Sequence, residues 1–319
     1  MPANHSMKIH FIIFLFAALF LIPSANAAQR TYSWGYILHS SNLTDNYLKT
    51  VIPAYSVISI TGFRLAADGS LTIDPAALIK RTIALAKKHS VKLYPLISFG
   101  SPDGGRRLLN LKSARARAIR GIARLTEEHN FAGIHLDFEY LPPEDSNRLG
   151  EFLSELRALP FSGSITVAVF PPVEFPEKWS RFHDLSLIAA YADEVVLMGY
   201  DLHGTHTGPG PVTDPEWVEK NIRAVLKHIR PEKLWLGIPA YGYRWCGGRA
   251  AALSAKQAVR LARSYKSSRD DRSQNLSYAM PAQHCYVYAS DRRTRETLTR
   301  LAGNYGLAGT ALWRLGFED

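Results

Sequence analysis

Residues 131–140, FAGIHLDFEY, combine the composition of a buried strand with two carboxylates. The β-branched and aromatic residues indicate the strand. Ionised Asp137 and Glu139 are costly to bury, so a strand that accepts both needs a reason beyond packing. Because side chains alternate along a strand, His135, Asp137 and Glu139 share one face, and the opposite face is wholly apolar. The polar face therefore marks a candidate functional site.

The spacing of the two carboxylates predicts a shared proton. Residues two apart on one strand face lie roughly 6–7 Å apart at their Cα atoms. At that distance the two charges repel, so one group tends to stay protonated near neutral pH. Glu139 lies nearer the strand end and has the longer side chain, so it is the candidate acid. A structural ion pair is the alternative, but this face offers no basic partner beyond His135.

Short apolar runs alternate with longer amphipathic stretches along the chain. The predicted strands are residues 34–38, 57–61, 92–98, 133–137, 165–170, 194–200, 234–239 and 310–315. The predicted helices are residues 75–89, 114–129, 144–159, 183–190 and 215–230, the first capped by Asp74. Eight strands with intervening helices predict the α/β class and a (β/α)8 barrel. A doubly wound sheet is the alternative, but no G-x-G-x-x-G pattern follows the first strand.

The connection between the seventh and eighth strands is longer than one helix requires. Residues 240–308 contain a predicted helix (254–264), a polar patch (267–275), a strand-like run (284–289) and a second helix (293–305). We interpret this region as an elaborated connection within one barrel domain, residues 28–319.

The N-terminus has the layout of a secretory signal peptide over residues 1–27. Lys8 precedes an apolar run at residues 11–22, and the small-residue tripeptide 25–27 predicts cleavage before Ala28. An uncleaved membrane anchor is the alternative, but a span needs about 20 apolar residues. We therefore expect an exported protein, periplasmic or secreted.

Charge and cysteine content narrow the candidate partners. The formal net charge is +10, and removing Lys8 with the signal peptide leaves +9 (10 − 1), which suits approach to an acidic envelope polymer. A role in solubility alone would also explain the positive net charge, and no motif in the sequence predicts nucleic acid binding. Cys246 and Cys285 are the two cysteines; in an oxidising compartment they predict one disulfide, with two free buried thiols as the alternative. They lack the clustered partners of a metal site.

Five segments in barrel order resemble a known family. GIHLDFE (133–139) resembles the D-G-x-D-x-D-x-E strand of glycoside hydrolase family 18, the chitinase-like enzymes. The segments 98–101 (SFGS), 198–201 (MGYD), 236–245 (LGIPAYGYRW) and 311–319 (ALWRLGFED) are similar to the third, sixth, seventh and eighth strands of that family. The resemblance covers essentially the whole mature chain, and it implies the barrel fold.

The resemblance implies catalytic and binding roles for five residues. In that family the 2-acetamido carbonyl of the substrate attacks the anomeric carbon. Glu139 would protonate the glycosidic oxygen and then activate water, and Asp137 would hold the acetamido N–H and stabilise the developing positive charge. Tyr200 would bond the acetamido carbonyl, and Asp201 would bind sugar hydroxyls. Trp313 would stack on the apolar face of the sugar.

Other positions are candidates for the substrate site. The motifs place Met198 and Tyr241 among them, and Trp245 is a further groove candidate. Tyr200 and Trp313 would be equally ordinary as barrel core.

The chain departs from the family pattern at two positions of the carboxylate strand. Ala132 and His135 stand where the family has the first and second Asp. The second Asp of the family helps the third, which corresponds to Asp137. A neutral His135 could donate to Asp137, and a charged one would lower its pKa. We therefore also count His135 among the substrate-site residues.

The sequence predicts an exported glycosidase that hydrolyses β-1,4 bonds in N-acetylglucosamine-containing polymers, either peptidoglycan or chitin. The charge and the WRLGFED ending favour the branch of bacterial cell-wall and spore-cortex enzymes. The first alternative is a non-catalytic chitinase-like lectin, although such lectins typically lose the acid that Glu139 supplies. The second is an unrelated barrel enzyme. No metal or organic cofactor is implied, because the acetamido group and two carboxylates suffice.

Overall fold

The computed structural model describes Met1 and residues 33–160 and 163–319. Apart from Met1, the predicted signal peptide (residues 1–27) lies outside the described residues. The predicted domain boundary at residue 28 also lies outside them. Among the described residues, none of the helices combines the length and the apolarity that crossing a bilayer requires.

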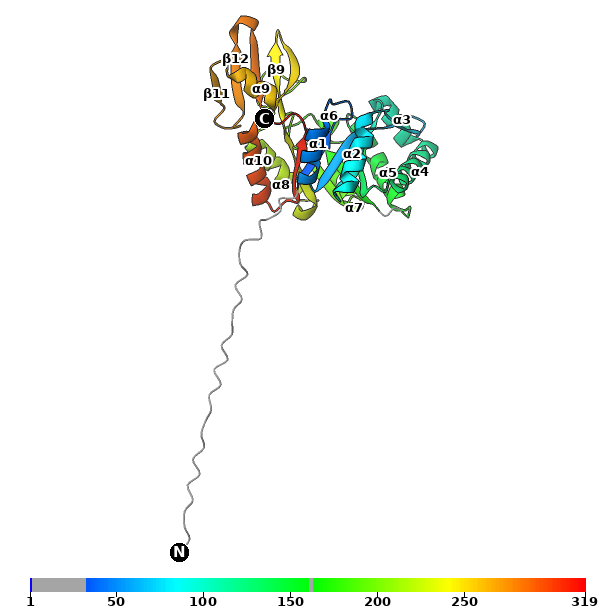
Figure 1. Cartoon of the computed structure of the whole chain (residues 1–319). Coiled ribbons are helices and arrows are strands. Elements are labelled where there is room, and N and C mark those ends of the chain that lie inside the picture. Colours follow the sequence, from blue (N-terminus) through cyan, green and yellow to red (C-terminus); the bar gives the residue numbers. More distant parts are fainter. Residues whose placement is uncertain (2–32, 161–162) are drawn as a thin grey trace. The chain divides into compact units, whose positions relative to one another are not determined.

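Eight parallel strands form a closed barrel, as the sequence predicts (Figure 1). Each strand pairs with its neighbour in the ring, and pairing of β1 with both β2 and β14 closes it. A short strand, β3 (Leu71–Ile73), pairs antiparallel with the edge of β2. The barrel strands are β1 (Ser33–Ile37), β2 (Val57–Leu65), β4 (Lys92–Phe99), β5 (Gly133–Leu136), β6 (Ser164–Val169), β7 (Glu194–Met198), β8 (Leu234–Pro239) and β14 (Gly309–Trp313).

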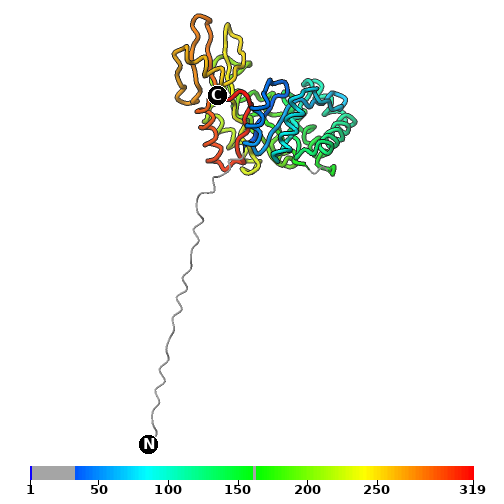
Figure 2. Tube along the Cα trace, in the orientation of Figure 1, coloured from blue at the N-terminus to red at the C-terminus, as the bar shows by residue number. Residues whose placement is uncertain are grey.

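Helices cover the outer face of the barrel (Figure 2). The main apolar core lies between them and the outward-facing side chains of the strands, for example Ile134, Leu136 and Phe138 of the carboxylate strand region, which are fully buried. The helices are α1 (Asp45–Val51), α2 (Ala77–Lys88), α3 (Pro102–Asn110), α4 (Lys112–His129), α5 (Ser146–Arg157), α6 (Glu177–Ser180), α7 (Leu185–Tyr191), α8 (Pro215–Val225) and α10 (Arg292–Asn304).

The predicted start of the first long helix was wrong. Helix α2 begins at Ala77, and its N-cap Ala76 makes no side-chain capping bond. Asp74 instead accepts hydrogen bonds from the Nε and Nη2 atoms of Arg64 at 3.0 and 2.8 Å. A charge-assisted pair between Arg64 of β2 and Asp74, which follows β3, replaces the predicted cap at this position.

The sequence prediction also missed α3. Its segment, PDGGRRLLN, contains two adjacent glycines, which are poor helix formers. Ser101 caps the helix by accepting from Gly104 N–H at 3.1 Å, and Pro102 occupies its first turn. Gly105 packs where a Cβ would lie 2.3 Å from the Phe99 ring, so close packing explains this glycine.

The elaborated connection forms a second sheet, called here the insertion (residues 241–289; Figure 1). Its five strands are antiparallel in the order β10-β9-β13-β12-β11, and the sequence predicted only one of them. The elements are β9 (Tyr241–Cys246), β10 (Arg249–Ser254), α9 (Ala255–Ala262), β11 (Ser267–Arg269), β12 (Leu276–Met280) and β13 (Cys285–Ala289). Cys246 and Cys285 face each other across β9 and β13 and form the predicted disulfide.

Candidate active site

A pocket of about 220 Å³ opens at the carboxyl ends of the barrel strands. All eight predicted catalytic and substrate-binding residues line it, together with three that the sequence prediction missed. The lining residues are Tyr36, Leu96, His135, Asp137, Glu139, Ala168, Met198, Tyr200, Asp201, Tyr241 and Trp313. The fold thus brings together side chains that lie more than 270 positions apart in the sequence (313 − 36 = 277).

The two carboxylates follow the fourth barrel strand. Strand β5 ends at Leu136, one residue earlier than predicted, but the Asp137 N–H still bonds the Ile97 carbonyl at 2.9 Å. The predicted alternation holds, because Leu136 and Phe138 pack into the helix-side core while Asp137 and Glu139 line the pocket. The pocket explains how a strand of this composition accommodates two acids.

Burial raises the pKa of both carboxyls. The pKa of Asp137 rises to about 6 because burial disfavours its anion, and a hydrogen bond from Glu139 opposes that rise. The pKa of Glu139 rises well above its ordinary value, first through burial and then through the charge of Asp137. Glu139 therefore holds the proton and donates it in a hydrogen bond to Asp137. This division of roles is that of an acid beside an anion.

His135 does not bond Asp137, contrary to one of our expectations. Its Nε2 lies 2.9 Å from the Tyr36 hydroxyl, and its Nδ1 lies 2.8 Å from the Thr166 hydroxyl. The side chain is fully buried, and burial lowers its pKa to about 3, so the ring is neutral. Because both ring nitrogens bond protein groups, His135 offers no free polar atom to a substrate.

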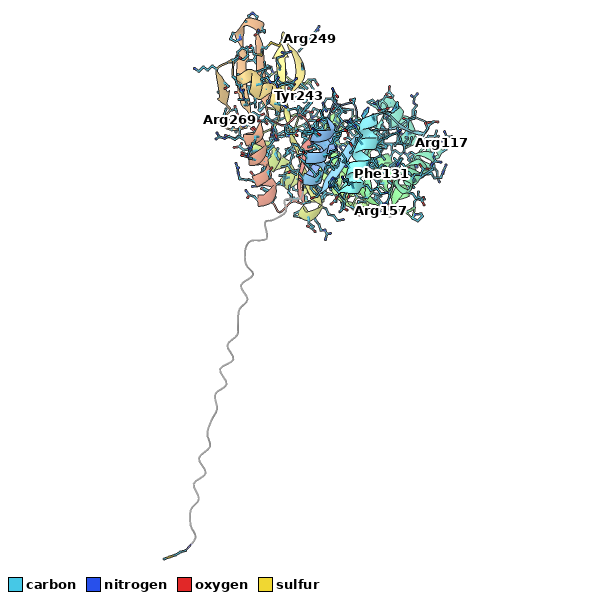
Figure 3. The ribbon with its side chains drawn as sticks, viewed as in Figure 1. Arg117, Phe131, Arg157, Tyr243, Arg249 and Arg269 are labelled. Atoms are coloured by element: carbon cyan, nitrogen blue, oxygen red, sulfur yellow. A yellow bond between two sulfur atoms is a disulfide. The ribbon has the colours of Figure 1, made fainter. Side chains whose placement is uncertain are left out.

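Asp201 is held by two tyrosines of the insertion. The Tyr241 hydroxyl donates to Asp201 Oδ1 at 2.5 Å, and the Tyr243 hydroxyl donates to the same atom at 3.0 Å. Burial raises the pKa of Asp201, and these two hydrogen bonds oppose the rise. Tyr243, which the sequence prediction missed, lies where the insertion meets the barrel (Figure 3). Two positions apart on β9, both tyrosines project from one face of that strand.

The remaining predicted residues form an aromatic and apolar wall. Tyr200 is buried and packs edge-on against Tyr241, with ring centroids 6.1 Å apart. Trp313 packs edge-on against Tyr36 at 5.3 Å, and the peptide bond that follows Trp313 is cis. Met198 lines the same wall. These rings offer flat apolar faces of the kind that pack on sugars.

Trp245, the further groove candidate, does not line the pocket. It is almost fully buried, packs against Tyr243 and Tyr288, and its Nε1–H bonds the Thr207 carbonyl at 3.3 Å. Trp245 therefore contacts Tyr243 without reaching the pocket itself.

Tyr36 and Tyr140 are functional candidates that the sequence prediction missed. Tyr36 faces inward near the end of β1, and alternation along that strand could have identified it. Tyr140 follows Glu139 directly and hydrogen-bonds it, which lowers the pKa of Glu139. Tyr140 also packs edge-on against Trp179 at 5.2 Å, a contact between distant segments that only the tertiary structure reveals.

In residues 33–160 and 163–319, no group of three or more His, Cys, Asp or Glu side chains is placed to hold a metal ion. The pocket itself is lined by carboxyls, tyrosines and other aromatic and apolar side chains, together with His135.

Known proteins resemble this chain in sequence and in fold. The chain is 28% identical to the uncharacterized glycosylase YvbX of Bacillus subtilis (strain 168), over 94% of this chain and 92% of that protein. The structure resembles a chitinase from Chromobacterium violaceum ATCC 12472 with a TM-score of 0.82 at 25% identity, covering 91% of this chain and 95% of that one. It resembles the spore cortex-lytic enzyme SleL of Bacillus megaterium QM B1551 with a TM-score of 0.78 at 25% identity, covering 90% and 71%. The model of the glycosyl hydrolases family 18 matches residues 3–318. With that match over nearly its whole length, the chain belongs to glycosyl hydrolase family 18 and is a glycoside hydrolase.

Proposed function

We propose that this glycoside hydrolase is exported and cleaves β-1,4 bonds in N-acetylglucosamine-containing polymers by a retaining, substrate-assisted mechanism. The observation that carries the proposal is the Asp137–Glu139 pair, two buried carboxyls that line the barrel pocket and whose pKa values burial raises.

The first step uses the proton of Glu139. Glu139 transfers it to the glycosidic oxygen, and the C–O bond to the leaving sugar breaks as the acetamido carbonyl oxygen of the substrate bonds to the anomeric carbon. The product is an oxazolinium ion, whose positive charge lies beside ionised Asp137. Asp137 also accepts the acetamido N–H. The high pKa of Glu139 keeps it protonated for this step.

The second step returns the proton to Glu139. Glu139, now ionised, takes a proton from water as the water oxygen bonds to the anomeric carbon and the oxazolinium ring opens. Two displacements at one carbon retain its configuration.

Other pocket residues hold the sugar during both steps. Tyr200 donates to the acetamido carbonyl and orients it, and Asp201, fixed by Tyr241 and Tyr243, accepts from sugar hydroxyls. Trp313 and Met198 supply the apolar surface beneath the ring. His135 acts on the site only through its neighbours.

One feature of this chain favours peptidoglycan over chitin as the polymer, whereas the matched structures include both a chitinase and a spore cortex-lytic enzyme and do not separate the two. The insertion carries six exposed cations that form no salt bridge within the described part of the chain: Arg244, Arg249, Lys256, Arg260, Arg263 and Lys266.

Two of these cations share a pocket. Arg244 and Arg260 line a hollow of about 330 Å³ with Gln257 and apolar side chains, and no acidic residue lines it. Arg249 lies on the neighbouring strand of the same sheet (Figure 3). Peptidoglycan carries carboxylates on its peptide stems whereas chitin is uncharged, so this surface complements peptidoglycan.

Export is supported by residues 1–27 and by the disulfide. A bond between Cys246 and Cys285 persists in an oxidising compartment. Subcellular fractionation with N-terminal sequencing tests export, and we expect a mature chain that begins at Ala28. A full-length chain in the cytoplasmic fraction would contradict it.

The activity is tested on labelled N-acetylglucosamine oligomers and on purified peptidoglycan, with Glu139→Gln as the matched variant. We expect hydrolysis with retained anomeric configuration, and a loss of about 10²–10⁴-fold in Glu139→Gln. Binding without turnover by the parent protein would favour the lectin alternative for this chain. Turnover that survives the Glu139 change would refute the mechanism.

A further inference from the structure

A chain of three buried hydrogen bonds includes Tyr36 and His135, which line the pocket together with the two carboxylates. The Thr166 hydroxyl lies 2.7 Å from the Ile134 carbonyl and 2.8 Å from His135 Nδ1, and His135 Nε2 lies 2.9 Å from the Tyr36 hydroxyl. Thr166 is the register partner of His135 on the adjacent strand β6. Thr166 and His135 are fully buried, and Tyr36 is nearly so.

The carbonyl at one end fixes the direction of every proton in the chain. Ile134 O can only accept, so Thr166 spends its single hydroxyl proton there. Thr166 must then accept from His135, which places the ring proton on Nδ1. Nε2 consequently carries the lone pair, and Tyr36 must donate its hydroxyl proton to it.

The direction of the Tyr36 proton matters to Asp137. Tyr36 and Asp137 line the same pocket, and they are close enough for the charge of Asp137 to raise the pKa of Tyr36. The other titratable groups that line the pocket are His135, Glu139, Tyr200, Asp201 and Tyr241, and Tyr140 lies close enough for the charge of Asp137 to raise its pKa. Of these, Glu139 hydrogen-bonds Asp137.

We propose that Thr166 is a positioning residue: by holding the Nδ1 proton of His135 it turns the Tyr36 hydroxyl proton away from Asp137, so that Glu139 is the donor to Asp137. Through this chain Thr166 sets the pH at which Asp137 ionises, although it touches neither carboxylate. The pH at which Asp137 ionises is a property of the protein without substrate, so this inference does not depend on which polymer is cleaved.

Thr166→Val tests the proposal, with Thr166→Ser as the matched control. Valine keeps the shape but cannot accept the Nδ1 proton, so His135 moves to the Nε2–H tautomer and donates to Tyr36. Tyr36 is then free to donate to Asp137. A hydrogen bond to a carboxylate stabilises the anion, so the acid limb of the pH–rate profile moves down by about one pH unit. Thr166→Ser retains the hydroxyl and the parent profile.

The tautomer is measured directly by ¹⁵N shifts of the histidine-labelled protein, with His135 assigned from its absence in His135→Gln. We expect protonated Nδ1 in the parent and in Thr166→Ser, and protonated Nε2 in Thr166→Val. This readout needs no substrate, so it separates failure of the proposal from failure of the proposed function. The proposal is overturned if His135 of the parent carries its proton on Nε2. It is also overturned if Thr166→Val lowers the rate by the same factor at every pH, because the acid limb would then not have moved.

Tyr36→Phe provides a second variant should Thr166→Val not fold. Because the Tyr36 proton points at His135, its removal takes no hydrogen bond from Asp137. The acid limb then stays at the parent pH, whatever the change in rate. An upward shift of that limb would show that Tyr36 already donates to Asp137, and it would overturn the proposal.

Discussion

His135, Asp137 and Glu139 stand on one face of the carboxylate strand region, and burial acts on them in opposite directions. Desolvation disfavours the charged form of any group, so it raises the pKa of the two carboxyls and lowers that of the imidazole. The site therefore keeps a neutral ring and a shared proton at the pH where a carboxyl pair in water would carry two charges. The spacing of the two carboxylates predicted the shared proton, whereas the partners of His135 come from β1 and β6.

The first prediction at this scale concerns the pH–rate profile. The reaction needs Asp137 ionised and Glu139 protonated, and the pKa of Asp137 is raised to about 6. We expect the rate to fall about tenfold per pH unit below that value. Initial rates on a labelled N-acetylglucosamine oligomer from pH 4 to 8 measure it. A flat profile down to pH 4 would exclude Asp137 as the ionised partner.

The second prediction concerns His135 and acid stability. The folded pKa of His135 is about 3, below the unfolded value of about 6.5, so only the unfolded chain binds this proton as the pH falls through that window. The native state therefore loses about 2 kcal/mol of stability at pH 5 through this group. We expect His135→Gln to be less stable than the parent, but its free energy of unfolding should fall by about 2 kcal/mol less than that of the parent between pH 7.5 and pH 5. Denaturant unfolding at the two pH values measures this difference. Equal losses would contradict a neutral buried His135.

At the scale of elements, apolar periodicity located the eight barrel strands, because each presents a long outward face to the helices. It failed for α3, where Gly104 and Gly105 interrupt the helical pattern. The reason is tertiary, since Gly105 lies against Phe99 with no room for a side chain. Two of the missed insertion strands, β10 (RAAALS) and β11 (SSR), are rich in Ala, Ser and Arg, which are not typical strand residues.

A pair of glycine substitutions tests this reading of α3. At Gly105 a Cβ would meet the Phe99 ring at 2.3 Å, so Gly105→Ala should destabilise the protein by about 1–3 kcal/mol. At Gly121, inside α4, the nearest atom would be Leu71 Cβ at an ordinary 3.5 Å, so Gly121→Ala should stabilise it by up to about 1 kcal/mol. Chemical denaturation of both variants measures the difference, and effects of the same sign would refute the explanation.

At the scale of the whole molecule, the insertion and the barrel together complete the site. Tyr241 and Tyr243 reach Asp201 from the first strand of the insertion, and the other strands of that sheet support them. The insertion also carries six exposed cations that form no salt bridge within the described residues, and two of them, Arg244 and Arg260, line one pocket. The sequence shows that these cations are present, and the structure places two of them on a common surface.

This distribution predicts a salt-dependent preference between polymers. The double variant Arg244→Gln/Arg260→Gln should bind soluble peptidoglycan fragments about three- to tenfold more weakly at low salt. It should bind uncharged N-acetylglucosamine oligomers as the parent does, and added salt should erase the difference. Arg120→Gln, which removes an exposed cation from α4, is the matched control. An equal loss on both ligands would argue against a role of charge in polymer choice.

The sequence by itself determined the barrel, the family and eight of the eleven residues that line its pocket. Strand periodicity and motif spacing are local properties, and a parallel barrel places the ends of its strands at one mouth.

Only the tertiary structure decided how the protons are arranged around those residues. The partners of His135 come from β1 and β6, and those of Asp201 come from the insertion. Hydrogen-bond direction and desolvation depend on which atoms meet in space, and residues about a hundred positions apart, such as Tyr36 and His135, carry no local sign of their contact.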